Sequence, residues 1–180
     1  IEGQENAEMV LVEAVRAVQG LASVADEALL ELLTAQGAVE TLAELLKVYM
    51  SSEPMVSACY HALAPICLDE QAVARAYGTE VLIPSAASWL QSNGANGDSS
   101  AVSNVLLAMS NIARAGEDGG YANAVFQSGV VDAVSEIANA QCADKDQPNI
   151  KVLQAAAEIV ASISVHGGLV GPLLEKGVAS

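Results

Sequence analysis

The feature that most constrains this chain is a short segment that recurs along it. A glycine followed by an apolar pair and a helical pattern occurs at Gly37 (GAVETLAELL) and at Gly129 (GVVDAVSEIA). A looser copy begins at Gly78 (GTEVLIPSAASWL), and GVAS begins at Gly177. The four glycines are 41, 51 and 48 residues apart. A period of about 20–50 residues indicates stacked supersecondary units that bury a continuous core only together.

A second landmark lies in the longer apolar segment that ends each unit. Residues 105, 108, 109 and 112 follow the i, i+3, i+4, i+7 spacing of one helix face, and no strand-like alternation runs over a comparable length. Each unit is therefore predicted to contain a short helix, a glycine corner, a middle helix, a loop and a long third helix. The long segments superpose at 13–23, 57–67, 104–114 and 156–165, with Gly20, Pro65, Asn111 and Ser162 in register.

The corner glycine is expected to stand where the first helix ends and the chain turns sharply. Only glycine adopts left-handed backbone angles without a Cβ penalty, so Gly129 is predicted to have a positive φ. Polar loops at 92–100 and 142–149 are predicted to join middle and third helices and to tolerate shortening. The stretch GEDGGYAN at 116–123 is interpreted as a flexible link to the next unit.

These units resemble the armadillo repeat in the pieces GAVETLAELL, VFQSGVVDAV, LLAMSNIA and LLEKGVAS. The resemblance covers nearly the whole chain and implies an all-α, right-handed superhelix forming one solenoid domain over 1–180. Three repeats are expected at 25–70, 71–116 and 117–166. Residues 6–24 would be the final helix of a preceding repeat, and 167–180 the start of a further one, so the chain is expected to be a fragment of a larger protein. HEAT repeats are the neighbouring alternative; the glycine corner and three helices per unit favour armadillo.

Composition narrows the classes of partner. The formal net charge of -15 argues against direct binding of nucleic acid, which depends on clustered Lys and Arg. No apolar run reaches the roughly 18 residues of a membrane-spanning helix, so no membrane insertion is expected. Cys59, Cys67 and Cys142 form no C-x-x-C motif, which favours reduced thiols in the cytoplasm, with the nucleus as the alternative compartment. Self-association through exposed solenoid ends is a further expected mode of contact.

Catalytic chemistry has little support in the sequence. His61 and His166 are the only histidines, and Cys59 with His61 makes an isolated C-x-H that is a weak metal signal. The segment at 116–123 lacks the lysine and the preceding strand of a phosphate-binding loop. We therefore predict no enzymatic activity, no cofactor and no metal.

The resemblance implies that third helices line a concave groove that binds a polypeptide. Importin alpha uses a repeated Asn there, with a Trp four residues earlier. Only Asn111 matches that Asn. The sole tryptophan, Trp89, lies in a middle helix and is expected to be packed in the core or to lie on the convex side of the solenoid. Nuclear-signal binding is therefore not implied.

The landmark and the positions four, seven or eight residues before it should share one surface, because those intervals are close to whole helical turns. The predicted groove residues are Glu13, Arg16, His61, Asn104, Asn111, Gln154 and Glu158. The predicted function is a protein-interaction scaffold. The alternative is a structural, regulatory or chaperone-like segment of a larger protein whose activity lies elsewhere.

Overall fold

The computed structural model describes residues 2–143 and 148–176, and within these ranges the chain forms helices and no strand. The long helix α1 (Glu2–Ser23) comes first, and the 3-10 turn η1 (Gly167–Leu169) and α11 (Val170–Glu175) come last. Between them lie α2 (Glu27–Ala35), α3 (Ala38–Tyr49), α4 (Glu53–Ile66), α5 (Glu70–Gly78), α6 (Leu82–Asn93), α7 (Ser99–Arg114), α8 (Gly120–Gln127), α9 (Val130–Ala143) and α10 (Ile150–Ser164). The all-helical class predicted from the apolar spacing is confirmed.

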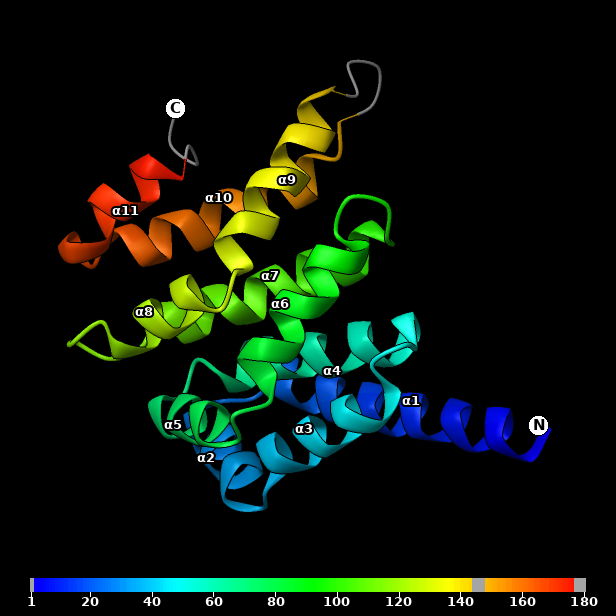
Figure 1. The fold of residues 1–180 in the computed structure, drawn as a ribbon. Helices are drawn as coiled ribbons and strands as arrows, with labels where there is room; N and C mark the ends of the chain where they lie inside the picture. The colour runs from blue at the N-terminus through cyan, green and yellow to red at the C-terminus, as the bar shows by residue number, and fades with distance from the viewer. Residues whose placement is uncertain (1, 144–147, 177–180) are drawn as a thin grey trace.

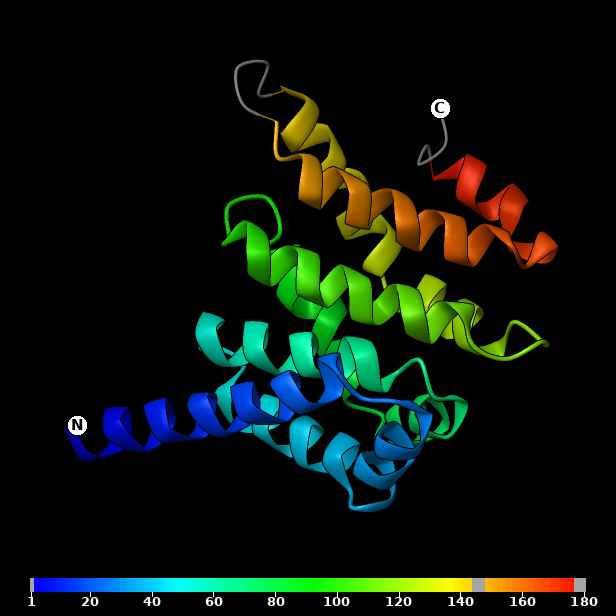
Figure 2. The same cartoon turned by 180° about the vertical axis from the view of Figure 1, so that it is seen from behind.

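The long helices lie side by side in chain order. Helices α1, α4, α7 and α10 form one layer, in which each packs mainly on its neighbours (Figure 2). Helices α3, α6 and α9 form a second layer behind it, and the short helices α2, α5 and α8 lie at one end of both layers (Figure 1). The chain therefore repeats the order short, middle, long three times, and the long helices share one face.

One apolar core runs between the two layers, from Val12 in α1 to Leu173 in α11. It is built mainly of Ala, Val, Leu and Ile, and it includes Trp89, which is 4% exposed and therefore packed. Small side chains allow the helices to approach closely. The buried Gly94 shows this at the end of α6, because a Cβ there would lie 2.5 Å from Ile137 Cδ1 in α9.

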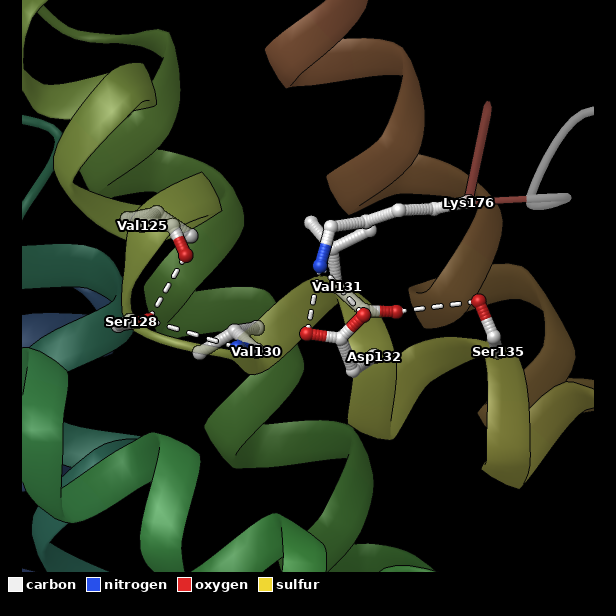
Figure 3. A network of polar contacts seen from close by, with 7 residues as sticks. All are labelled: Val125, Ser128, Val130, Val131, Asp132, Ser135 and Lys176. Carbon is white, nitrogen blue, oxygen red and sulfur yellow. Dashed lines mark hydrogen bonds and ion pairs between the residues drawn. The ribbon is translucent and has the colours of Figure 1, made fainter. Parts of the chain in front are cut away.

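The left-handed corner occurs between the short and middle helix of each group. Gly37 has φ 80° and Gly129 has φ 91°, so the positive φ predicted for Gly129 is confirmed. At the Gly129 corner the Ser128 hydroxyl donates to the Val125 carbonyl at 2.7 Å and accepts the Val130 N–H at 3.4 Å (Figure 3). The hydroxyl thus bridges the end of α8 to the start of α9.

The corner of the second group does not lie at Gly78, and that part of the repeat alignment is wrong by two residues. Gly78 is the last residue of α5, and the positive φ of 54° belongs to Glu80. Thr79 forms the same bridge as Ser128, since its hydroxyl donates to the Ala76 carbonyl at 2.8 Å and accepts the Val81 N–H at 3.4 Å. A non-glycine residue therefore occupies the left-handed position of this corner. Gly177 lies outside the described residues.

The connection predicted as a loop at 92–100 is shorter and more constrained than expected. Helix α6 continues to Asn93 and α7 begins at Ser99. The Asp98 carboxylate accepts the backbone N–H groups of Ser100 and Ala101, both at 3.0 Å, and thereby caps α7. The Asp98 N–H donates to Glu53 Oε1 at 2.5 Å. In the second predicted loop, α9 extends to Ala143, and residues 144–147 lie outside the described part of the chain.

The last helix is held on α9 by one lysine. Lys176 Nζ donates to Asp132 Oδ1 at 2.5 Å and to Oδ2 at 2.6 Å (Figure 3). The same Nζ lies 5.3 Å from the centroid of the Phe126 ring. Leu173 adds a buried apolar contact, so α11 continues the core beyond α10.

Gly129→Val is expected to lower the free energy of unfolding by about 1–3 kcal/mol, measured by denaturation followed by circular dichroism. Valine would have to adopt φ 91°, and its Cβ would approach Gln91 Nε2 to 2.7 Å. Gly20→Ala is the matched control, because a Cβ at that position in α1 meets no atom within 4 Å apart from its chain neighbours and the backbone of its own helix. The control should stabilise by about 0.5–1 kcal/mol. A Gly129→Val protein as stable as the wild type would contradict the strained corner.

Candidate functional site

A groove crosses the first three long helices. Its cavity has a volume of about 380 Å³, and three of the predicted groove residues, Arg16, His61 and Asn104, meet in it from three different helices. The lining residues are Arg16, Gln19, Glu53, Pro54, Ser57, Ala58, His61, Asp98, Ser100 and Asn104. We call this surface the α1–α4–α7 groove. The sequence does not predict Gln19, which lies one residue before the landmark Gly20 and off the whole-turn spacing. Ser57 lies eight residues before Pro65, a position that the spacing selects, but it is not among the predicted residues.

Arg16 and Glu13 form an ion pair at the α1 side of the groove. Arg16 Nη1 lies 2.6 Å from Glu13 Oε1, and the two side chains are 54% and 68% exposed. Exposed pairs of this kind contribute about 0–1 kcal/mol, so a ligand carboxylate can replace Glu13 at little cost. Glu13 lines a neighbouring depression of about 450 Å³, which also contains Arg16 and Pro54 and therefore continues the groove.

Asn104 and Asn111 hold α7 against α4. Asn104 Nδ2 lies 3.2 Å from Ser57 Oγ and 3.5 Å from the Ser57 carbonyl oxygen. Asn111 Nδ2 donates to the Ala64 carbonyl at 2.7 Å. The two asparagines are seven residues apart, as are their partners on α4, so the contacts repeat after two helical turns.

The Asn111 contact caps the end of α4. In the last turn the Cys67 N–H donates to the Leu63 carbonyl and the Leu68 N–H donates to the Pro65 carbonyl. Neither of these N–H groups bonds to the Ala64 carbonyl between them. Ala64 is buried, and a buried carbonyl without a donor is costly. Asn111, which we expected to face a ligand, therefore uses its amide N–H inside the protein.

The predicted residues on α10 lie outside the α1–α4–α7 groove. Gln154 Nε2 lies 3.3 Å from Glu158 Oε1, one turn along the same helix. The landmark Ser162 is buried against α7, with 2.8 Å between Ser110 Oγ and Ser162 Oγ. Ser162 donates its own hydrogen to the Glu158 carbonyl at 2.8 Å, so Ser110 is the donor to Ser162.

His166 contacts a carbonyl near the end of α7, as Asn111 contacts one near the end of α4. Its Nε2 lies 3.3 Å from the Ala113 carbonyl oxygen, near the C-terminal end of α7. The sequence placed His166 after the last long helix, but only the packing of α10 on α7 shows which carbonyl it meets.

The two buried thiols, Cys59 and Cys67, are unreactive at neutral pH. Burial raises the pKa of Cys59 to about 12, and burial with the nearby Asp69 carboxylate raises that of Cys67 to about 12, so both stay protonated at neutral pH. Among the described residues, no group of three or more His, Cys, Asp or Glu is placed to hold a metal ion. Within the same ranges no single helix is long and apolar enough to cross a membrane, and only the bent pair 150–164 and 167–175 passes that test jointly.

The chain matches no protein-family model and no curated protein sequence.

Asn111→Ala is expected to lower the free energy of unfolding by about 1–3 kcal/mol, because the buried Ala64 carbonyl loses its donor. Asn111→Asp should do the same with almost no change of shape, since a carboxylate cannot donate. Gln154→Ala is the control: it removes an exposed amide with one contact along its own helix, and should change stability by less than about 0.5 kcal/mol. Equal stabilities of the Asn111 variants and the control would show that the cap contributes nothing.

Proposed function

We propose that the chain is an armadillo-type segment of a right-handed helical superhelix that binds a partner polypeptide in the α1–α4–α7 groove. The observation that carries the proposal is the meeting of Arg16, His61 and Asn104 in one cavity across three successive long helices. The repeated order of short, middle and long helices, with the long ones side by side, supports the armadillo type.

The groove suits an extended backbone. The Gln19 amide, the Ser57 hydroxyl and the His61 imidazole supply donors and acceptors that can bond peptide groups whatever the ligand's sequence. Neighbouring helix axes are about 8–10 Å apart, so crossing three helices covers about 16–20 Å. An extended chain advances about 3.3 Å per residue, so the bound segment is about five or six residues long.

The groove carries one arginine and two carboxylates, so Arg16 is its one strong cationic donor to a ligand oxygen. Glu53 accepts the Asp98 N–H, and Asp98 in turn caps α7, so both carboxylates are held in place and keep their negative charge. Arg16 is paired only with the exposed Glu13, which a ligand carboxylate can displace. The groove is mixed in sign, so salt should weaken binding only moderately.

We propose binding rather than catalysis because the groove lacks an activated nucleophile. Ser57 and His61 both line it, but Ser57 Oγ accepts from Asn104 and no hydrogen bond joins it to His61. A hydroxyl without a base in contact is a weak nucleophile at neutral pH.

A peptide library selected against the folded chain tests the proposal. Arg16→Glu should weaken binding of the selected peptides by about tenfold or more, because the groove loses its guanidinium donors and gains a further carboxylate. Binding is measured by fluorescence anisotropy, and melting temperatures should stay within a few degrees of wild type.

Lys47→Glu on α3 is the matched control. Lys47 pairs with Glu44 at an i, i+3 spacing and 2.5 Å, as Arg16 pairs with Glu13, but it lies in the other layer. Its variant should bind the peptides normally. If Arg16→Glu binds the peptides normally and Lys47→Glu loses binding, the binding surface lies outside the groove. A library without any selected peptide would favour the structural or regulatory alternative.

A further inference from the structure

A second cavity lies at the opposite end of α7 from the α1–α4–α7 groove. It has a volume of about 730 Å³ and sits between α5 and the connection that leads into α8. Its side-chain walls are two tyrosines and three carboxylates: Glu70, Tyr77, Glu117, Asp118 and Tyr121. We call it the tyrosine cavity. The α1–α4–α7 groove and its proposed ligand do not involve any of these residues.

The aromatic wall joins two helices. Tyr77 near the end of α5 and Tyr121 in the first turn of α8 pack edge to face, with ring centroids 5.5 Å apart and an angle of 66° between the planes. Tyr77 is 51% exposed, so its ring is accessible from the cavity. Gly116 lets the connection close over Tyr121, because a Cβ there would lie 3.2 Å from the Tyr121 ring.

Every ionisable side chain in the wall is a carboxylate or a phenol. Asp118 is held in place by accepting the Gly120 N–H at 3.0 Å. No lysine, arginine or histidine lines the cavity, and the described residues give Glu70 and Glu117 no ion pair. The basic residues nearest in sequence are engaged elsewhere, Arg75 with Glu40 and Arg114 with Ser162.

We propose that the tyrosine cavity binds a cationic side chain, a guanidinium or an ammonium, of a partner polypeptide. A cation over a tyrosine ring is attracted by the negative face of the ring, and the surrounding carboxylates add charge-assisted hydrogen bonds. An anion would be repelled by three carboxylates, and an apolar group would desolvate them without giving hydrogen bonds in return. The open aromatic wall and the acidic rim thus select for a positive charge.

The experiment uses N-acetyl-glycyl-arginyl-glycinamide and the same peptide with citrulline, which keeps the shape of arginine without its charge. Each is titrated into the ¹⁵N-labelled chain by NMR. The arginine peptide should shift the amides of residues 116–121, and the citrulline peptide should bind at least about tenfold more weakly. A lysine peptide and free choline form two further arms. Equal binding of arginine and citrulline, or shifts confined to other parts of the chain, would overturn the proposal. If choline binds and neither the arginine nor the lysine peptide does, the proposal that the ligand is a polypeptide is wrong.

Four variants locate the interaction. Tyr77→Phe should retain affinity within about twofold, since the ring face remains, whereas Tyr77→Ala should lose about three- to fivefold. Glu117→Gln should weaken binding and reduce its dependence on salt, and Glu31→Gln on the exposed part of α2 should change neither. Equal losses of affinity in Tyr77→Phe and Tyr77→Ala would show that the peptide contacts the hydroxyl, and would contradict the cation–ring interaction. If Tyr77→Ala does not fold, Tyr77→Phe and Glu117→Gln still decide, because normal affinity and salt dependence in Glu117→Gln would contradict the acidic rim.

Discussion

The packing of α7 between α4 and α10 is the contact on which the rest of the structure depends. Its buried face carries Ala101, Val105, Ala108 and Ile112, which are fully buried between the two layers. Fully burying a Val, Leu or Ile side chain contributes about 1.5–3 kcal/mol, whereas the four ion pairs of the described residues are exposed or partly exposed and contribute about 0–1 kcal/mol each. Apolar packing therefore supplies the stability.

Polar contacts select the position in which the long helices pack. An apolar face alone tolerates a slide along the neighbouring helix, but a slide would separate Asn111 from the Ala64 carbonyl and Ser110 from Ser162. Each buried polar group left without a partner costs about 1–3 kcal/mol, which is enough to reject the shifted arrangement. The same position brings Asn104 beside Ser57 at one end of α7, and the connection after the other end forms part of the tyrosine cavity. Both proposed binding sites are consequences of where α7 sits.

The sequence predicted the helical class because the apolar spacing is local and strong. It predicted the corners at Gly37 and Gly129 for the same reason, since glycine marks a left-handed residue directly. It failed at Glu80, where the hydroxyl of Thr79 holds the corner and the nearby Gly78 belongs to the helix. Helix-turn spacing brought Arg16, His61 and Asn104 to one groove, but it could not show that the end of α4 presents a carbonyl to Asn111. The sequence does not predict the tyrosine cavity, because its two rings are far apart in the chain and the glycine-rich segment 116–123 indicates a link.

A double-mutant cycle on Ser110 and Ser162 tests most directly whether buried polar contacts set the position of α7. Ser162→Ala leaves the Ser110 hydroxyl buried without its acceptor and should lower the free energy of unfolding by about 1–3 kcal/mol. Ser110→Ala should cost less, because Ser162 keeps the Glu158 carbonyl and Arg114. The double variant should then lose about 1 kcal/mol less than the sum of the two single losses. Losses that simply add in the double variant would contradict the account.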